Sequence, residues 1–177
     1  MNDADHRHSH DDGCCEAKRT LLHRNGPGAH GKPWNVTVDV YLNNDDDPPD
    51  FDIRTCLETI PGDIKHPILV FNNYERNGFS IEFQLWDNTG NNYKFPKDPR
   101  LAVWSQKDGC PKGPDGVWDI FKPQGVSPDG LTLTVSNANS SSCPLGYFYY
   151  TLRATNGDNW VELDPGGVNN NGATNLA

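Results

Sequence analysis

Residues 79–86 read FSIEFQLW, and the apolar side chains of Ile81, Phe83 and Leu85 occupy alternate positions of this stretch. Successive side chains of a β-strand point to opposite faces, so the alternation predicts a strand with these three residues on one buried face. The same period recurs in WNVTVDVYL at 34–42, LTLTVS at 131–136 and YFYYTLRAT at 147–155. The repeated alternation indicates a β-rich domain.

Shorter apolar runs predict further strands, separated by turn sequences such as SPDG at 127–130. The runs are ILVF at 68–71, LAVW at 101–104, VWDIF at 117–121 and WVEL at 160–163. The acidic stretch NNDDDPPDFD at 43–52 contains two prolines, which cannot donate a backbone hydrogen bond, so we expect a loop there.

No window of eleven or more residues shows a helical stripe of apolar side chains, and parallel strands ordinarily need helical crossovers. We therefore expect an all-β fold. Its predicted architecture is a mostly antiparallel sandwich of two sheets, with seven to nine short strands, similar to an immunoglobulin-type domain.

The apolar residues divide the chain into three parts. Residues 1–33 mix His, Asp, Arg, Gly and Pro with almost no apolar periodicity, so we expect a disordered arm. The β-sandwich domain is expected to span residues 34–166, which hold nearly all of the Leu, Ile, Val and Phe. Residues 167–177 are rich in Asn and Gly and are expected to form a flexible tail.

The chain of 177 residues carries a net charge of −9, and this charge lies on the central part because residues 1–33 balance their acids and bases. An acidic domain repels nucleic-acid phosphates and anionic lipids, so we expect no nucleic-acid or membrane partner. No signal-like apolar run precedes residue 30, which favours a cytoplasmic protein. Cys110 and Cys143 both lie in Pro/Gly loops that would allow them to meet in a disulfide. In the reducing cytoplasm we expect both to be free thiols.

The closing stretch YYTLRATNGDNWVELDPGGVNNNG, at 149–172, resembles the end of small uncharacterised bacterial β-sandwich proteins, including those labelled DP-EP. The residues that carry the likeness are Asp164, Pro165, Asn169 and Gly172. The stretches IEFQLWDNTG and PQGVSPDGLTLTVSN are similar in style, so the likeness spans residues 34–172. The resemblance implies a bacterial protein with an immunoglobulin-like sandwich and no established activity.

Catalytic candidates are few. His66 is the one histidine after residue 30, and the chain contains no nucleophile elbow, phosphate loop or metalloprotease motif. Cys56 precedes His66 by ten residues and would suit a thiolate pair, although a buried strand cysteine near a surface histidine is the commoner arrangement. We therefore expect a protein that is not an enzyme, with no catalytic residues and no dedicated cofactor.

Three tryptophans are candidates for ligand binding. Trp86, Trp104 and Trp160 each neighbour a core position of a predicted strand, so the alternation directs them outward. Exposed aromatic rings beside Asn-rich and Asp-rich loops can stack on sugar rings, which suggests a carbohydrate-binding module. In the other interpretation, which we favour, the rings shield the ends of the sheets, or loops cover the second face of the sheet.

The stretch DADHRHSHDDGCC, at 3–15, holds five candidate metal ligands: His6, His8, His10, Cys14 and Cys15. Imidazole and thiolate suit Zn²⁺ and other transition metals. A disordered arm must be ordered on binding, which weakens affinity, so a solvated tail with weak metal binding is the competing interpretation.

Three functions stay open. The first is a non-catalytic interaction or structural module whose partner is another protein or a second copy of the chain. The second is a carbohydrate-binding module that uses the tryptophans. The third is metal handling by the arm.

Overall fold

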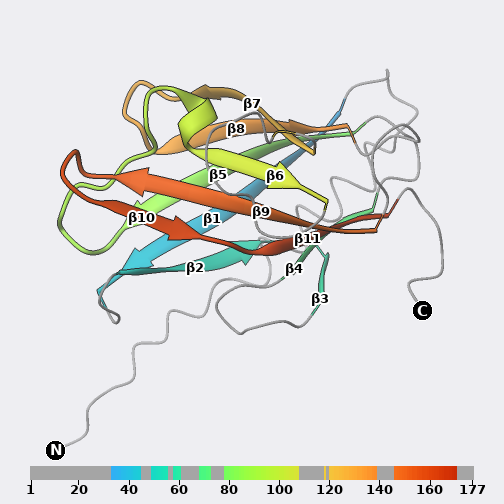
Figure 1. The fold of residues 1–177 in the computed structure, drawn as a ribbon, viewed down its shortest axis with the longest axis horizontal. Helices are drawn as coiled ribbons and strands as arrows, with labels where there is room; N and C mark the ends of the chain where they lie inside the picture. Colours follow the sequence, from blue (N-terminus) through green and yellow to red (C-terminus); the bar gives the residue numbers. More distant parts are fainter. Residues whose placement is uncertain are drawn as a thin grey trace, which may run out of the picture.

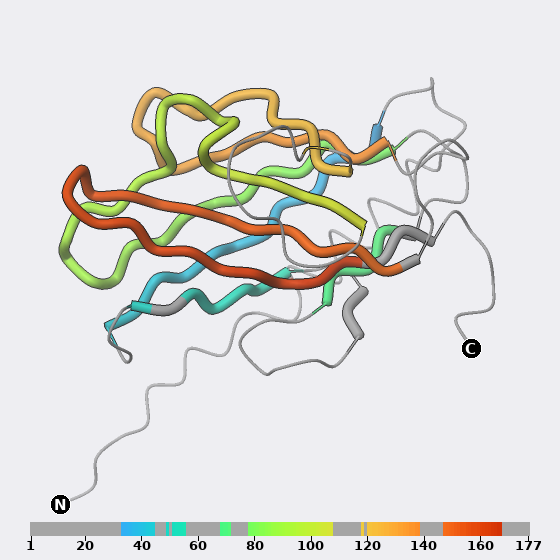
Figure 2. Tube along the Cα trace, in the orientation of Figure 1, coloured from blue at the N-terminus to red at the C-terminus, as the bar shows by residue number. Residues whose placement is uncertain are grey.

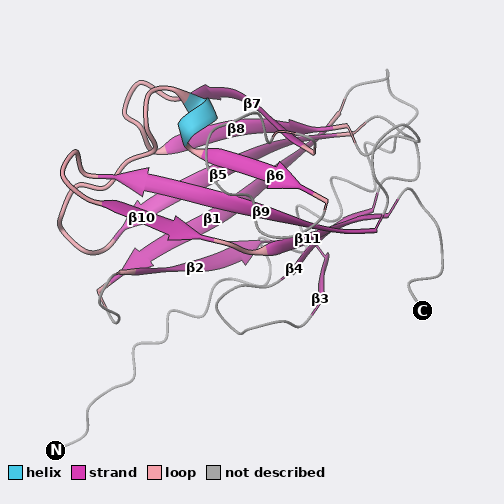
Figure 3. Ribbon diagram, in the orientation of Figure 1, coloured by secondary structure: helices cyan, strands magenta, loops and turns pink. Residues whose placement is uncertain are grey.

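The computed structural model describes residues 33–44, 49–55, 58–60, 68–72, 78–107, 118, 120–138 and 146–170. In these ranges the chain is all-β, as predicted, with eleven strands and one short 3₁₀ helix, η1 (Pro99–Leu101). Figure 3 shows how strands dominate the described chain. None of the described helical residues forms a segment long and apolar enough to cross a membrane.

The first sheet has the order β2-β1-β5-β8-β7. Its central strands are the stretches with the clearest alternation, because inward and outward side chains can alternate only in an extended chain. The bounds are β1 (Trp34–Asn43), β2 (Asp50–Thr55), β5 (Phe79–Asp87), β7 (Phe121–Val126) and β8 (Thr132–Asn137).

The second sheet has the order β10-β9-β11-β4-β3, and β6 pairs with the other edge of β9. The bounds are β3 (Glu58–Ile60), β4 (Ile68–Asn72), β6 (Val103–Gln106), β9 (Gly146–Thr155), β10 (Trp160–Leu163) and β11 (Gly166–Asn170). Figure 2 shows the chain from 147 to 167, orange to red, folding back on itself as a long hairpin.

Strands β10 and β11 form one interrupted strand. Both pair antiparallel with β9 in a single continuous register, from Trp160 opposite Thr155 to Asn169 opposite Gly146. The interruption falls at Asp164 and Pro165, where the proline has no N–H to donate. Its carbonyl oxygen still accepts a hydrogen bond from the Tyr150 N–H at 3.0 Å. The second sheet therefore has five strand positions, like the first.

Both sheets are mixed. β1 runs parallel to β5 and β11 runs parallel to β4, whereas the other named pairs are antiparallel. We expected parallel pairs to need helical crossovers, but here the chain passes from β1 to β5 through β2 of the first sheet and then β3 and β4 of the second. Strands of the opposite sheet therefore provide the crossover connection that a helix provides in a βαβ unit.

In the view of Figure 1, β9 of the second sheet passes in front of β1 of the first. One apolar core lies between the two sheets. Aromatic rings from both layers meet there, such as Phe83 of β5 and Tyr150 of β9, whose centroids are 6.1 Å apart. The core includes Ile81, Phe83 and Leu85, the residues of the opening stretch, and all three are buried. The alternation therefore placed this strand with the correct face inward.

The strand count differs from the seven to nine that the sequence predicts, since the described residues hold eleven. Strand β2 begins within the stretch expected to be a loop, just after Pro49, and continues beyond it at the edge of the first sheet, where a missing donor is tolerated. Strand β7 contains Pro123 and has a bulge between Pro123 and Gly125, again at an edge. Strand β11 extends past the boundary expected at residue 166.

Candidate interaction surface

Four large apolar side chains are substantially exposed among the described residues. Tyr147 is 55 % exposed, Tyr149 40 % and Trp160 42 %, and all three point away from the core on the outer face of β9 and β10. The fourth, Trp86, is 48 % exposed and belongs to β5 of the first sheet. Because the two sheets share a core on their inner faces, Trp86 lies on the opposite side of the molecule.

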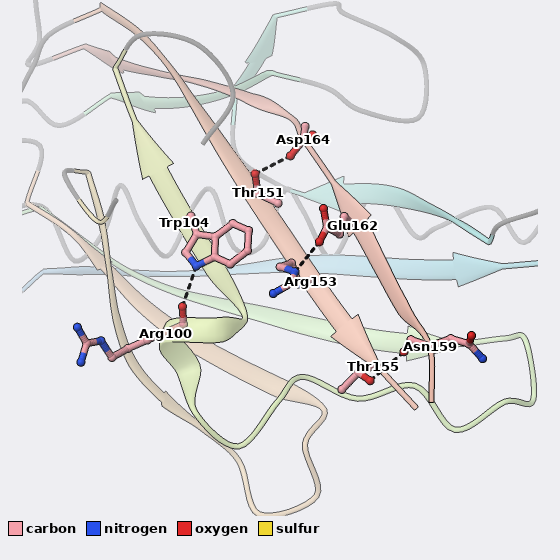
Figure 4. Close-up of polar contacts among 8 residues, drawn as sticks. All are labelled: Arg100, Trp104, Thr151, Arg153, Thr155, Asn159, Glu162 and Asp164. Atoms are coloured by element: carbon pink, nitrogen blue, oxygen red, sulfur yellow. Dashed lines mark hydrogen bonds and ion pairs between the residues drawn. The ribbon is translucent and has the colours of Figure 1, made fainter. Parts of the chain in front are cut away.

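The outer face of the second sheet carries an arginine between two tryptophans. The guanidinium carbon of Arg153 lies 4.6 Å from the ring centre of Trp104 and 4.1 Å from that of Trp160. The three residues come from β6, β9 and β10, which are neighbours in the sheet. Arg153 also makes an ion pair with Glu162, with 2.7 Å between Nε and Oε1 (Figure 4). These contacts hold the arginine in one place.

Trp104 lies on the outer side of the sheet but is only 4 % exposed. Its indole N–H donates to the Arg100 carbonyl oxygen of η1 at 2.9 Å (Figure 4). The Arg100 guanidinium in turn lies 4.4 Å from the ring centre of Trp118, whose indole N–H donates to the Val103 carbonyl oxygen. The alternation assigned Trp104 to the outer side of its strand, where the Arg153 guanidinium packs over its ring, and yet the side chain is buried.

The turn between β9 and β10 fixes the position of Trp160. The Thr155 hydroxyl donates to the Asn159 carbonyl oxygen at 2.8 Å (Figure 4), and the Asn156 side-chain oxygen accepts from the backbone N–H groups of Asp158 and Asn159. Gly157 has φ of 101°, a conformation that glycine adopts without strain. The TNGDN sequence thus sets the register of the hairpin.

Polar contacts continue along the same face. The Thr151 hydroxyl donates to the Asp164 carboxylate, where Pro165 interrupts the strand (Figure 4). Beyond this row lie Tyr149 and then Tyr147, toward the other end of β9. These residues form an aromatic strip along the outer face. Trp160 and Arg153 lie near one end of the strip, and Tyr149 and Tyr147 lie near the other.

Trp86 belongs to a separate cluster on the first sheet. Its ring stacks on Tyr41 of β1, with centroids 6.0 Å apart and planes inclined by 13°, and its N–H donates to Asp39 at 3.0 Å. Arg54 covers the Tyr41 ring at 4.6 Å and pairs with Asp52 at 3.0 Å. Burial raises the pKa of the Tyr41 hydroxyl, and the Asp39 carboxylate raises it further.

The three predicted tryptophans therefore do not form one platform. Trp104 and Trp160 share Arg153, whereas Trp86 lies on the other side of the core. Tyr147 and Tyr149, which were not among the predicted binding residues, are exposed on the same face as Trp160. The sequence does contain their signal, because Phe148, Tyr150 and Leu152 occupy the inward positions of YFYYTLRAT and leave the tyrosines outside.

The other predicted site residues lie outside the described residues. These are the candidate metal ligands His6, His8, His10, Cys14 and Cys15, the pair Cys56 and His66, and the cysteines Cys110 and Cys143. Among the described side chains, no group of three or more His, Cys, Asp or Glu is placed to hold a metal ion. Weak metal binding by residues 1–33 stays a prediction.

The chain was compared with family models and with curated proteins, and neither comparison finds a match.

Proposed function

We propose that the protein is a non-catalytic interaction module that binds another protein through the outer face of β9 and β10. The observation that carries this proposal is that three of the four most exposed large apolar side chains of the described chain, Tyr147, Tyr149 and Trp160, share this face. Exposed aromatic residues gathered on one face are typical of binding surfaces, whereas single ones are not.

The residue types support the same proposal. Tyrosine, tryptophan and arginine are enriched among the residues that contribute most to the affinity of protein interfaces. Binding normally costs the ordering of long side chains, at about 0.5 to 1.5 kcal/mol for each. Arg153 is already held by Trp104, Trp160 and Glu162 in the unbound protein, so that little further ordering is required.

The proposal includes the immunoglobulin-like architecture that the sequence predicts. The two mixed sheets with a common core are compatible with an immunoglobulin-like sandwich, and the resemblance to DP-EP-like bacterial proteins would fit a domain without catalytic residues. The residues of that likeness, Asp164 and Pro165, stand where the hairpin strand is interrupted beside the proposed surface.

The test compares three full-length proteins: the wild type, the double variant Tyr147→Ala/Tyr149→Ala and the control Trp86→Ala. Trp86 is equally exposed but lies on the opposite face. We expect a partner protein that is retained by the wild type and the control and is lost from the double variant, as measured by quantitative affinity capture. Sedimentation velocity of the same three proteins shows whether that partner is a second copy. Equal capture or association by all three would reject this face as the interface.

A further inference from the structure

The outer face of the first sheet differs in character from the aromatic strip on the second. Around the Tyr41–Trp86 pair, its outward positions are polar: Thr37 and Asp39 on β1, Glu82 and Gln84 on β5, and Thr132 and Thr134 on β8. One exposed aromatic pair thus borders a sheet surface of hydroxyl, amide and carboxylate groups.

The indole of Trp86 is held in a fixed orientation. Tyr41 stacks against it, and its only polar atom, Nε1, donates to Asp39. Arg54 supports the stack through the Tyr41 ring. The 48 % of Trp86 that is exposed is therefore an apolar aromatic surface whose position is set before any ligand arrives.

Polar groups stand in the next row of the sheet. Asp39 and Gln84 are opposite each other in the β1–β5 register, one row from Tyr41 and Trp86, which corresponds to about 7 Å along the strands. Gln84 accepts a hydrogen bond from the Thr132 hydroxyl at 2.8 Å through its side-chain oxygen, which fixes the amide and leaves its NH₂ group as a donor. A ligand on Trp86 thus meets both donors and acceptors beside the ring.

The charges of this surface disfavour an anionic ligand. The described outward positions of β1, β2 and β5 hold three carboxylates, Asp39, Asp52 and Glu82, and one guanidinium, Arg54. Arg54 is paired with Asp52 and packed on Tyr41, so its charge is already compensated. The surplus of negative charge would repel phosphates and acidic sugars.

We propose that Trp86, with Asp39 and Gln84, forms a binding site for neutral oligosaccharides on the first sheet. A sugar ring has an apolar face of C–H groups and a rim of hydroxyls. The apolar face would lie on the Trp86 indole, while the rim hydroxyls bond to the Gln84 amide and the carboxylate of Asp39 or Glu82. The site is on the opposite side of the core from the proposed protein-binding face and does not depend on it.

The experiment uses the full chain and a panel of immobilised hexasaccharides. Cellohexaose, xylohexaose, mannohexaose and N-acetylchitohexaose are the neutral probes, and hexagalacturonate is the anionic probe. We expect binding to at least one neutral probe and no binding to hexagalacturonate.

Calorimetric titration of the best neutral probe then compares variants. Trp86→Ala should weaken binding by about tenfold or more, and Gln84→Ala by a smaller factor, because stacking and hydrogen bonds each contribute. Trp160→Ala is the matched control, an equally exposed tryptophan on the opposite face, and should leave the affinity unchanged. The proposal is overturned if no neutral probe binds, if hexagalacturonate binds as tightly as the best neutral probe, or if the Trp160→Ala control loses binding as strongly as Trp86→Ala.

Discussion

The guanidinium of Arg153 lies over the ring of the exposed Trp160, 4.1 Å from its centre, although the two residues stand on adjacent strands and are not directly opposite in register. Residues diagonal to each other on one face of an antiparallel pair are within reach when the side chains are long or aromatic. Trp104 on the other side of Arg153 completes a diagonal row across three strands. The contacts within this row fix the side-chain positions on the outer face of these strands.

Replacement of the two tryptophans of this row should have unequal effects on stability. Trp104→Ala removes a side chain that is only 4 % exposed and should cost about 3 to 5 kcal/mol of unfolding free energy. Trp160→Ala, at 42 % exposure, loses one cation–π contact and should cost about 1 kcal/mol or less. Urea unfolding of both variants provides the comparison, and equal losses would contradict the assignment of Trp104 as a packed residue.

The sequence predicted which faces of the main strands are buried. Alternation placed β1, β5, β8 and β9 on the correct faces, because one buried face and one exposed face give a period of two. It did not predict that Trp104 is buried, since its two described contacts, with the Arg153 guanidinium and the Arg100 carbonyl oxygen, come from residues outside its own strand. Nor did it predict the parallel pairs, because pairing between distant strands leaves no local pattern.

The adjacent glycines of β11 should respond differently to alanine. A Cβ at Gly167 would lie 2.3 Å from Cζ of Phe148, which is fully buried and packed against the rings of Phe71 and Phe121. We expect Gly167→Ala to cost about 1 to 3 kcal/mol or more, as overpacking does. Thermal unfolding monitored by circular dichroism measures the loss.

Gly166→Ala is the control for that variant. A Cβ there would have its nearest contact with Ile68 at 3.5 Å, an ordinary van der Waals distance. Since alanine is less costly to order in a strand than glycine, this variant should be neutral or stabilised by less than about 1 kcal/mol. Similar melting temperatures for the two variants would contradict the close approach of Gly167 to Phe148.

The hydroxyl of Tyr150 should be dispensable for stability. It has no hydrogen-bond partner among the described residues. Its burial raises the pKa of the hydroxyl strongly. Tyr150→Phe keeps the ring, which packs 5.0 Å from that of Phe121, and removes the desolvated polar atom. We expect unchanged stability or a gain of up to about 1 kcal/mol in urea unfolding.

Phe83→Ala provides the contrast within the same aromatic cluster. Phe83 is fully buried, and its ring contacts those of Phe121 and Tyr150. Loss of the whole ring should cost about 3 to 5 kcal/mol. If Tyr150→Phe instead lost more than about 1 kcal/mol, the hydroxyl would have to make a stabilising hydrogen bond.

The SPDG turn between β7 and β8 should show a defined dependence on pH. A hydrogen bond from the Ser127 hydroxyl lowers the pKa of the Asp129 carboxyl, and the backbone N–H of Leu131 lowers it further. A lowered pKa in the folded state means that ionised Asp129 stabilises the turn above the ordinary aspartate pKa of about 3.9. This stabilisation is lost as the pH falls through the lower, folded-state value.

Two measurements test this sign. An NMR titration of the Asp129 carboxyl carbon in the full chain should give a midpoint below the ordinary aspartate value. Asp129→Asn should lower the melting temperature at about pH 7, and the difference from wild type should shrink as the pH falls from about 4 through the lower folded-state pKa, because the carboxylate is protonated first in the unfolded and then in the folded chain. A difference that stays constant or grows on acidification would show that Asp129 does not stabilise the turn through its charge.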